Sequence, residues 1–138
     1  MIKKPKKKTK SQLVKQLDAI YSLYTRLSWS NDHWMCQCVT CNVIKHYKEM
    51  QDWHFISRGN YKYRWSDDNN FVQCYVCNVI LNWNYQKYTM FMIKRYWIRR
   101  VKKRINEVKQ INDIKPYEIE EKIEYYKELV KDLQTTIY

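Results

Sequence analysis

Two stretches decide how this chain folds: CVTC at residues 38–41 and CYVCN at residues 74–78. Each carries two cysteines on one tight turn, and two such turns can complete a tetrahedral zinc site. The fifth cysteine, Cys36, has poorer ligand spacing and is treated as a spare thiol. An odd number of cysteines without a secretory signal argues against a disulfide framework. The sequence predicts one structural Zn²⁺, held by Cys38, Cys41, Cys74 and Cys77.

The composition limits what the chain can be. Its 138 residues and 17.3 kDa suit one compact domain. With a single glycine the chain cannot contain a glycine-rich phosphate-binding loop. No apolar run approaches the length of a membrane-spanning helix, and no apolar stretch follows the charged N-terminus. We therefore expect no membrane association, no secretory signal and a cytoplasmic location.

Positive charge is concentrated in two segments. The chain has 26 Lys and Arg against 14 Asp and Glu, which gives a formal net charge of +12. Residues 1–10 carry six lysines and no acid, and residues 94–109 carry eight basic residues against Glu107 alone. Two basic segments in a chain that is otherwise nearly neutral indicate a polyanionic partner. Nucleic acid is a better candidate for this partner than an anionic membrane.

Helical periodicity marks both ends of the chain. Apolar residues recur three and four positions apart over residues 11–29 and again after Pro116, which predicts an amphipathic helix in each segment. Ser11 is the expected N-cap of the first helix. A further helical stretch is expected over residues 78–109, with one break near Trp83.

The middle of the chain lacks helical periodicity and is rich in aromatic and β-branched residues. We predict a β-hairpin with strands at residues 52–56 and 61–65, joined by a turn that contains Gly59. Residues 31–41 are expected to be a polar turn, and residues 67–70 a loop. A histidine on the first strand, then an asparagine-bearing loop and a helix, is the outline of a ββα-metal nuclease site.

The residue types in that outline suit phosphodiester hydrolysis. An imidazole with a pKa near neutrality can activate water as a general base. An asparagine amide or a backbone carbonyl can fix the tautomer and angle of that imidazole. One hard divalent cation can neutralise charge that builds on the phosphate and on the leaving oxygen.

Several stretches together resemble the phage NinG/Rap family of HNH-type recombination nucleases. They are QDWHFISR at residues 51–58, RW at residues 64–65, Asn69, QCYVCN at residues 73–78, Tyr88 and the acidic segment after Pro116. The resemblance implies an α+β, mainly helical fold, in which a zinc-stapled ββα-metal (HNH-like) core is flanked by N- and C-terminal helices. It also implies cleavage of branched DNA, such as Holliday junctions and D-loops, during phage recombination.

The resemblance also assigns roles to individual residues. His54 is the general base. Asn69 is the middle asparagine of the HNH pattern, because four residues separate it from Cys74, and Asn70 is the alternative if the loop register shifts by one. Asn78, directly after the second cysteine pair, is a ligand of a catalytic Mg²⁺ or Mn²⁺.

The chain departs from the HNH pattern immediately before the base. Many HNH sites carry a metal ligand there, whereas this chain has Trp53. Asp52 is the alternative ligand, because alternate residues of a strand share a face and Asp52 would lie on the same side as His54. His33 and His46 lack such a context and are treated as structural.

Basic side chains near the site and in the second basic segment are the candidates for contacts to DNA phosphates. They are Arg58, Arg64, Lys94, Arg95, Arg99, Arg100, Lys102, Lys103 and Arg104. Most aromatic residues are expected in the core, although some near this segment can stack on unpaired bases. These are Tyr85, Tyr88, Tyr96 and Trp97.

The expected organisation is a basic tail (residues 1–10), a zinc-stapled HNH-like nuclease domain with its N-terminal helix (11–110) and a C-terminal amphipathic helix (111–138). We expect a metal-dependent, structure-selective DNA endonuclease that cuts branched double-stranded DNA inside a phage-infected bacterium. Two symmetric nicks at a junction imply a homodimer. The alternative is a non-catalytic, zinc-stapled accessory protein that binds DNA junctions. A nuclease for RNA or unbranched DNA is a third hypothesis.

Overall fold

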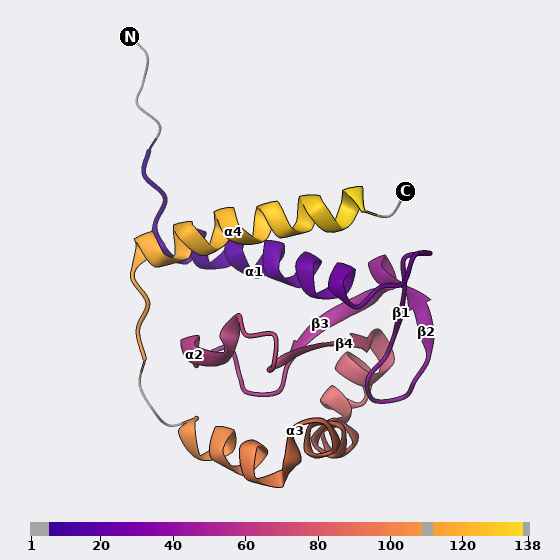
Figure 1. Cartoon of the computed structure of the whole chain (residues 1–138). Helices are drawn as coiled ribbons and strands as arrows, with labels where there is room; N and C mark the ends of the chain where they lie inside the picture. Colours follow the sequence, from indigo (N-terminus) through magenta and orange to yellow (C-terminus); the bar gives the residue numbers. More distant parts are fainter. Residues whose placement is uncertain (1–5, 109–111, 137–138) are drawn as a thin grey trace.

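The fold is mixed helix and sheet, and it is mainly helical (Figure 1). The computed structural model describes residues 6–108 and 112–136. Its elements are α1 (Lys10–Ser28), β1 (Met35–Gln37), β2 (Ile44–His46), η1 (Tyr47–Glu49), β3 (Met50–His54), α2 (Tyr61–Arg64), β4 (Asn70–Cys74), η2 (Val76–Ile80), η3 (Asn82–Asn84), α3 (Tyr85–Glu107) and α4 (Pro116–Thr135). None of the described helices is long and apolar enough to cross a membrane.

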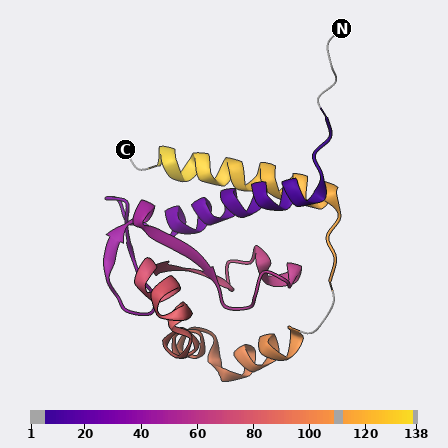
Figure 2. The same cartoon turned by 180° about the vertical axis from the view of Figure 1, so that it is seen from behind.

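The elements are arranged in three layers around the β3–β4 hairpin. Helix α4 lies along α1, α1 covers one side of the hairpin, and α3 lies on the opposite side; the view from behind shows the same order (Figures 1 and 2). Phe71 of β4 packs edge-on against Tyr88 and Phe91 of α3. The hairpin is therefore buried between helices, which shields the residues that it carries from solvent.

The N-cap of helix α1 lies two residues before the expected one. The hydroxyl of Thr9, not that of Ser11, accepts a hydrogen bond from the Gln12 backbone N–H at 3.3 Å, and the Thr9 N–H donates to Gln12 Oε1 at 2.9 Å. This reciprocal pair is a capping box. The predicted helix is confirmed, but Ser11 as its cap is wrong, because Thr9 satisfies the first free N–H groups.

The C-terminal helix packs on α1 and completes a shared apolar core. Pro116 occupies the first turn of α4, as the sequence predicts, since proline lacks only an N–H that would be unpaired there. The rings of Tyr21 and Tyr126 meet edge to face with centroids 4.8 Å apart. The predicted boundary between residues 110 and 111 lies outside the described residues.

The returning strand of the hairpin is not the predicted one. β3 pairs antiparallel with β4, so that His54 faces Asn70 and Met50 faces Cys74. The predicted strand at residues 61–65 is wrong, because Tyr61–Arg64 form the short helix α2. The side chain of Asn60 caps this helix by accepting a hydrogen bond from the Lys62 N–H at 3.0 Å.

The helical stretch after the second cysteine pair is broken twice. The predicted break near Trp83 is confirmed: Asn82, Trp83 and Asn84 all have positive φ angles. A second break inside α3, at Trp97 with φ 65°, was not predicted. No glycine or proline marks that position, so the sequence contains no local signal for it.

Candidate functional site

The two cysteine pairs lie on separate turns that the backbone brings together. β1 and β2 form a short antiparallel hairpin, so strand β1 falls within the segment predicted as a polar turn. The turn of this hairpin carries Cys38 and Cys41, while Cys74 ends β4 and Cys77 lies in the next turn. The Val39 N–H donates to the carbonyl of Val72 at 3.1 Å and joins the first turn to β4.

The four thiols form a cluster of the right size for one metal ion. Their sulfur atoms all lie within 4.8 Å of one another, and those of Cys41 and Cys74 are 3.7 Å apart. Zinc–sulfur bonds of about 2.3 Å in a tetrahedron separate the sulfurs by about 3.8 Å. The predicted convergence of the four cysteines is confirmed, and their thiols fit Zn²⁺ with little rearrangement. Four protein ligands leave no open position on such an ion.

The surroundings of the cluster shift the thiol pKa values in opposite directions. Burial raises the pKa of Cys38, but the Thr40 hydroxyl and nearby backbone N–H groups outweigh it and lower that pKa to about 6. Burial and the adjacent thiols raise the pKa of Cys41 to about 12. The amide of Asn84 donates to the sulfur of Cys77 at 3.4 Å. Such contacts orient ligands and stabilise negative charge on sulfur.

Cys36 lies outside the cluster. Its side chain is buried, and its thiol donates to the carbonyl oxygen of Arg26 at 3.1 Å. Burial raises its pKa to about 11. A protonated thiol tied to α1 is a packing group, which agrees with its treatment as a spare cysteine.

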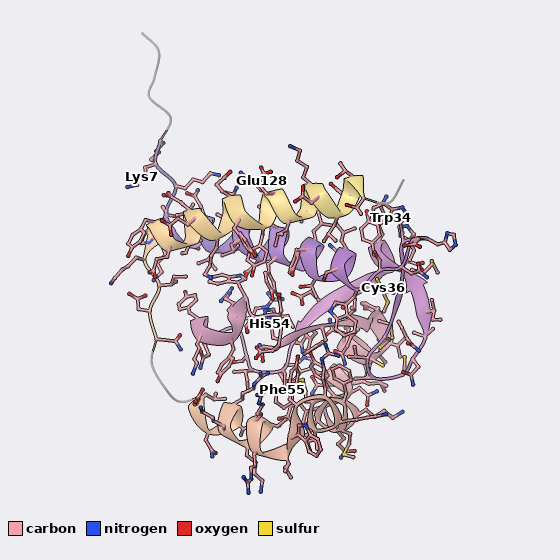
Figure 3. The ribbon with its side chains drawn as sticks, in the orientation of Figure 1. Lys7, Trp34, Cys36, His54, Phe55 and Glu128 are labelled. Carbon is pink, nitrogen blue, oxygen red and sulfur yellow. The ribbon has the colours of Figure 1, made fainter. Side chains whose placement is uncertain are left out.

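Strand β3 divides its side chains between the two helical layers. Met50, Asp52 and His54 are buried, whereas Gln51 and Trp53 are half-buried. Figure 3 shows His54 in the middle of the molecule, nearer to α1, with Phe55 nearer to α3. His54 and Asp52 therefore share one face of the strand, as the sequence predicts.

The contacts of His54 define its tautomer. Its Nε2 lies 2.9 Å from the carbonyl oxygen of Arg64, which can only accept, so Nε2 carries the proton. Its Nδ1 is buried and has no hydrogen-bond partner among residues 6–108 and 112–136. Burial and the nearby Arg58 guanidinium lower the pKa of His54 to about 4. The imidazole is therefore neutral near pH 7, with a free lone pair on Nδ1, and its pKa lies below the near-neutral value expected from the sequence.

Asn69 and Asn70 hold the turn that faces His54. The amide of Asn69 accepts from the Ile56 N–H at 2.7 Å and donates to the carbonyls of Ile56 and Tyr63 at 3.1 and 3.0 Å. The amide of Asn70 donates at 3.2 Å to the Arg64 carbonyl that also binds His54. Asn69 thus fixes the backbone that follows His54 in the chain. Asn70 helps to position the Arg64 carbonyl, which is the hydrogen-bond acceptor for His54.

Asp52 and Asn78 line one pocket of about 430 Å³ beside β3. The amide nitrogen of Asn78 donates to Gln51 Oε1. Asp52 Oδ1 and Asn78 Oδ1 are buried oxygens for which the described residues supply no hydrogen-bond partner. Burial raises the pKa of Asp52 to about 7, against the opposing charges of Arg58 and Arg26. Unpaired buried oxygens of this kind are suitable ligands for a hard divalent cation.

His54 lines a different pocket, so the structure does not bring it and Asn78 into one cavity. The His54 pocket has a volume of about 610 Å³. Trp53 and Arg58 line both pockets, and the Arg58 guanidinium lies over the Trp53 ring at 5.8 Å from its centroid. These two side chains are therefore shared by the pocket of His54 and the pocket of Asp52 and Asn78.

Two of the candidate phosphate-binding arginines already have carboxylate partners. Arg64 forms a bidentate pair with Asp18, with N···O distances of 3.0 and 2.7 Å. Arg104 is buried and paired with Asp68. Their assignment to DNA binding is therefore replaced by a structural one. Asp18 was missed from the sequence because nothing near it in α1 signals a partner 46 residues away.

The other basic candidates on α3 are exposed. They are Lys94, Arg95, Arg99, Arg100, Lys102 and Lys103. Of the aromatic candidates nearby, Tyr88 is buried and donates its hydroxyl to the Trp53 carbonyl at 2.9 Å, whereas Trp97 is 79% exposed. Lys109 of the same basic segment lies outside the described residues.

Comparison with known proteins identifies one family. The family model described as Bacteriophage Lambda NinG protein matches residues 1–136 of the chain. No curated protein and no solved structure matches the chain.

Proposed function

The chain belongs to the bacteriophage lambda NinG family, and from that premise we propose that it is a metal-dependent endonuclease of the HNH type. Its substrates would be branched recombination intermediates, such as Holliday junctions and D-loops. Its place of action would then be the host cytoplasm, where phage DNA recombines. The observation that carries the proposal is the tautomer of His54, whose free Nδ1 is the atom a general base needs.

The contacts of His54 support its role as the general base. Because the Arg64 carbonyl holds the Nε2 proton, Nδ1 keeps its lone pair and can accept a proton from a water molecule. A buried atom without a partner among the described residues costs stability, which favours a functional reason for its retention. Asn69 and Asn70 act as positioning residues, since they contact the turn and not the reacting atoms.

Asp52 and Asn78 would hold the catalytic Mg²⁺ or Mn²⁺. Both present an unpaired oxygen at the same pocket, and Asn78 is fixed there by its bond to Gln51. Such an ion would supply charge stabilisation for the phosphate and for the leaving 3′ oxygen. The cysteine cluster positions Asn78, because Cys77 directly precedes it in the chain.

The separation of the two pockets agrees with an in-line displacement. In that reaction the attacking water and the leaving oxygen lie on opposite sides of the phosphorus atom. Arg58 lines both the pocket of His54 and the pocket of Asp52 and Asn78. A phosphate bound by Arg58 would therefore have the base on one side and the metal ligands on the other.

The exposed basic side chains of α3 would bind the DNA backbone without reading sequence. Arg99, Arg100, Lys102 and Lys103 follow the break at Trp97. Within the described residues, Arg99, Arg100 and Lys102 form no salt bridge, and Lys103 has only a 3.9 Å pair with Glu107. The affinity for DNA should fall steeply as the salt concentration rises, because binding releases counterions from the DNA phosphates. Two symmetric cuts would need two copies of the chain.

The strongest alternative is a non-catalytic protein that binds DNA junctions. The observation that favours it is that His54 lines one pocket while Asp52 and Asn78 line another. This alternative predicts tight, salt-sensitive binding of four-way junctions and no cleavage with any divalent ion.

One assay separates the two functions. Purified protein is incubated with a labelled synthetic four-way junction, with Mn²⁺ or without divalent ions, and both binding and strand cleavage are followed. The nuclease proposal expects cleavage only with Mn²⁺, lost in Asn78→Ala and kept in the matched control Asn106→Ala, whose side chain is exposed. Binding without cleavage in Mn²⁺ or Mg²⁺ would establish the accessory function instead.

A further inference from the structure

A separate pocket of about 460 Å³ lies where the end of α1, the loop before β4 and α3 meet. Thr25, Trp29, Asp67, Asn70 and Arg95 are among its lining residues. Its volume falls within the roughly 300–1,000 Å³ of small-ligand pockets. The proposed hydrolysis uses no side chain of this pocket for chemistry, so its polar atoms need another explanation.

Two buried side chains present unpaired oxygen atoms at this pocket. Asn70 is 1% exposed and Thr25 3% exposed, and neither Asn70 Oδ1 nor Thr25 Oγ1 finds a partner in the part of the chain that the structure describes. The amide nitrogen of Asn70 donates to the carbonyls of Tyr63, Arg64 and Ser66. With both amide hydrogens used, Asn70 can offer a ligand only a hydrogen-bond acceptor.

Asp67 adds a carboxylate that is held in place. The Tyr21 hydroxyl donates to Oδ1 at 2.8 Å and the Tyr24 hydroxyl donates to Oδ2 at 3.0 Å. Each carboxylate oxygen keeps a further lone pair for a ligand. No lysine or arginine within the described ranges forms a salt bridge with Asp67.

Arg95 provides the complementary donors and a flat surface. Its guanidinium lies 5.3 Å from the ring centroid of Trp29 and 5.7 Å from that of Phe71. Its side chain makes no salt bridge inside residues 6–108 or 112–136. A planar guanidinium beside an indole can stack on a base, and its N–H groups can donate to base acceptors.

The pocket therefore offers acceptor oxygens from Asp67 and Asn70 together with the N–H donors of Arg95. Adenine and cytosine carry an amino group next to a ring acceptor, and thymine carries one N–H between two carbonyls. Guanine alone has adjacent N1–H and N2 amino donors, together with the O6 and N7 acceptors that arginine prefers. We propose that this pocket binds an unpaired guanine of the DNA, with Asp67 and Asn70 accepting from its donors and Arg95 facing O6 and N7.

This inference rests on the proposed function only for its DNA context, and it can be tested without cleavage. Short fluorescent oligothymidine strands with one central dG, dA or dC, and the plain strand, are titrated with the whole protein without added divalent ions. Anisotropy should show the dG strand binding about 5–150-fold more tightly than the other three, the range that one good bidentate contact supplies.

Variants assign the preference to the pocket. Asp67→Asn keeps one side-chain oxygen that can accept from a tyrosine hydroxyl and replaces the other by an NH2 group, which can only donate. The dG preference should therefore disappear, while the affinity for plain oligothymidine stays within about twofold. Asp32→Asn, which removes an exposed acid elsewhere, should keep the preference. Arg95→Lys keeps the positive charge but loses the planar fork, and should reduce the preference.

The outcomes are decisive in both directions. Equal affinity for the four strands, no binding of any strand, tightest binding of another base, or a dG preference that survives Asp67→Asn would overturn the guanine pocket. A protein that prefers dG but cuts no junction would support the pocket and contradict the nuclease proposal.

Discussion

The carbonyl oxygen of Arg64 lies 2.9 Å from His54 Nε2 and fixes which ring nitrogen carries the proton. This contact depends on the short helix α2, because Arg64 ends that helix and the Asn69 amide binds the Tyr63 carbonyl next to it. The geometry of the candidate base is therefore set by backbone atoms, whose positions depend on a few buried side chains.

The first prediction concerns Asn69. Asn69→Ala removes three buried hydrogen bonds and leaves the Ile56 N–H without its acceptor. We expect the free energy of unfolding to fall by about 2–4 kcal/mol, because each unsatisfied buried group costs about 1–3 kcal/mol. Urea denaturation measures this change. Asn106→Ala, on the exposed side of α3, should change stability by less than about 0.5 kcal/mol, and an equal loss in both variants would contradict the bracing role of Asn69.

The second prediction concerns the cysteine cluster. Purified protein should contain one Zn²⁺ per chain, measured by elemental analysis. Chelation should unfold the protein at least in part, since structural zinc supplies about 10–16 kcal/mol of binding free energy in small sites. Cys41→Ser should lose the metal. Cys36→Ser should retain it, because this residue lies outside the cluster; loss of zinc from Cys36→Ser would contradict the ligand assignment.

The third prediction separates two arginines of the same helix. Arg104 is buried and paired with Asp68, whereas Arg100 is exposed. Arg104→Ala should lower the free energy of unfolding by about 1–3 kcal/mol, because it removes the hydrogen bonds that the buried guanidinium donates to the backbone carbonyl and the carboxylate of Asp68. Arg100→Ala should leave stability nearly unchanged but weaken junction binding and reduce its salt slope by about 1. Thermal unfolding measures the stability of both variants, and junction binding at several salt concentrations measures their salt slopes. A stability loss in Arg100→Ala together with weaker DNA binding only in Arg104→Ala would contradict the roles given to the two arginines.

The fourth prediction concerns the break in α3. Trp97 has φ 65° and is 79% exposed, so its side chain gains little from packing while its backbone occupies a conformation that favours glycine. Trp97→Gly should raise the free energy of unfolding by about 1 kcal/mol. Ile98→Gly, at the next and regularly helical position, should lower it by about 1 kcal/mol. Destabilisation by Trp97→Gly as large as that by Ile98→Gly would show a continuous helix.

The sequence predicts the cysteine cluster correctly because metal-ligand spacing is a direct constraint on three-dimensional position. The sequence does not predict strand β4, whose five residues are all buried. Helices cover both faces of the hairpin, so β4 shows no alternation of polar and apolar residues, and its Asn70 and Gln73 read as loop residues. Tyr61–Arg64 alternate in polarity like a strand but form a helical turn, because Asn60 caps them.

The sequence names candidate site residues, but it does not predict how they are arranged. His54, Asn69, Asn78 and Asp52 follow from motif and strand alternation. That His54 lines one pocket while Asp52 and Asn78 line another depends on tertiary packing, which no local pattern encodes. The carboxylate partners of Arg64 and Arg104 were likewise unpredictable, since both contacts join residues far apart in sequence.

The most direct test of the base assignment is chemical rescue of His54→Ala by free imidazole. The variant is first checked for zinc content and far-ultraviolet circular dichroism, with His33→Ala as the exposed control. On a four-way junction with Mn²⁺, His54→Ala should cut about 10²–10⁴-fold more slowly than the unmodified protein, and imidazole should restore part of that rate. Undiminished cleavage by a folded His54→Ala protein would contradict the account.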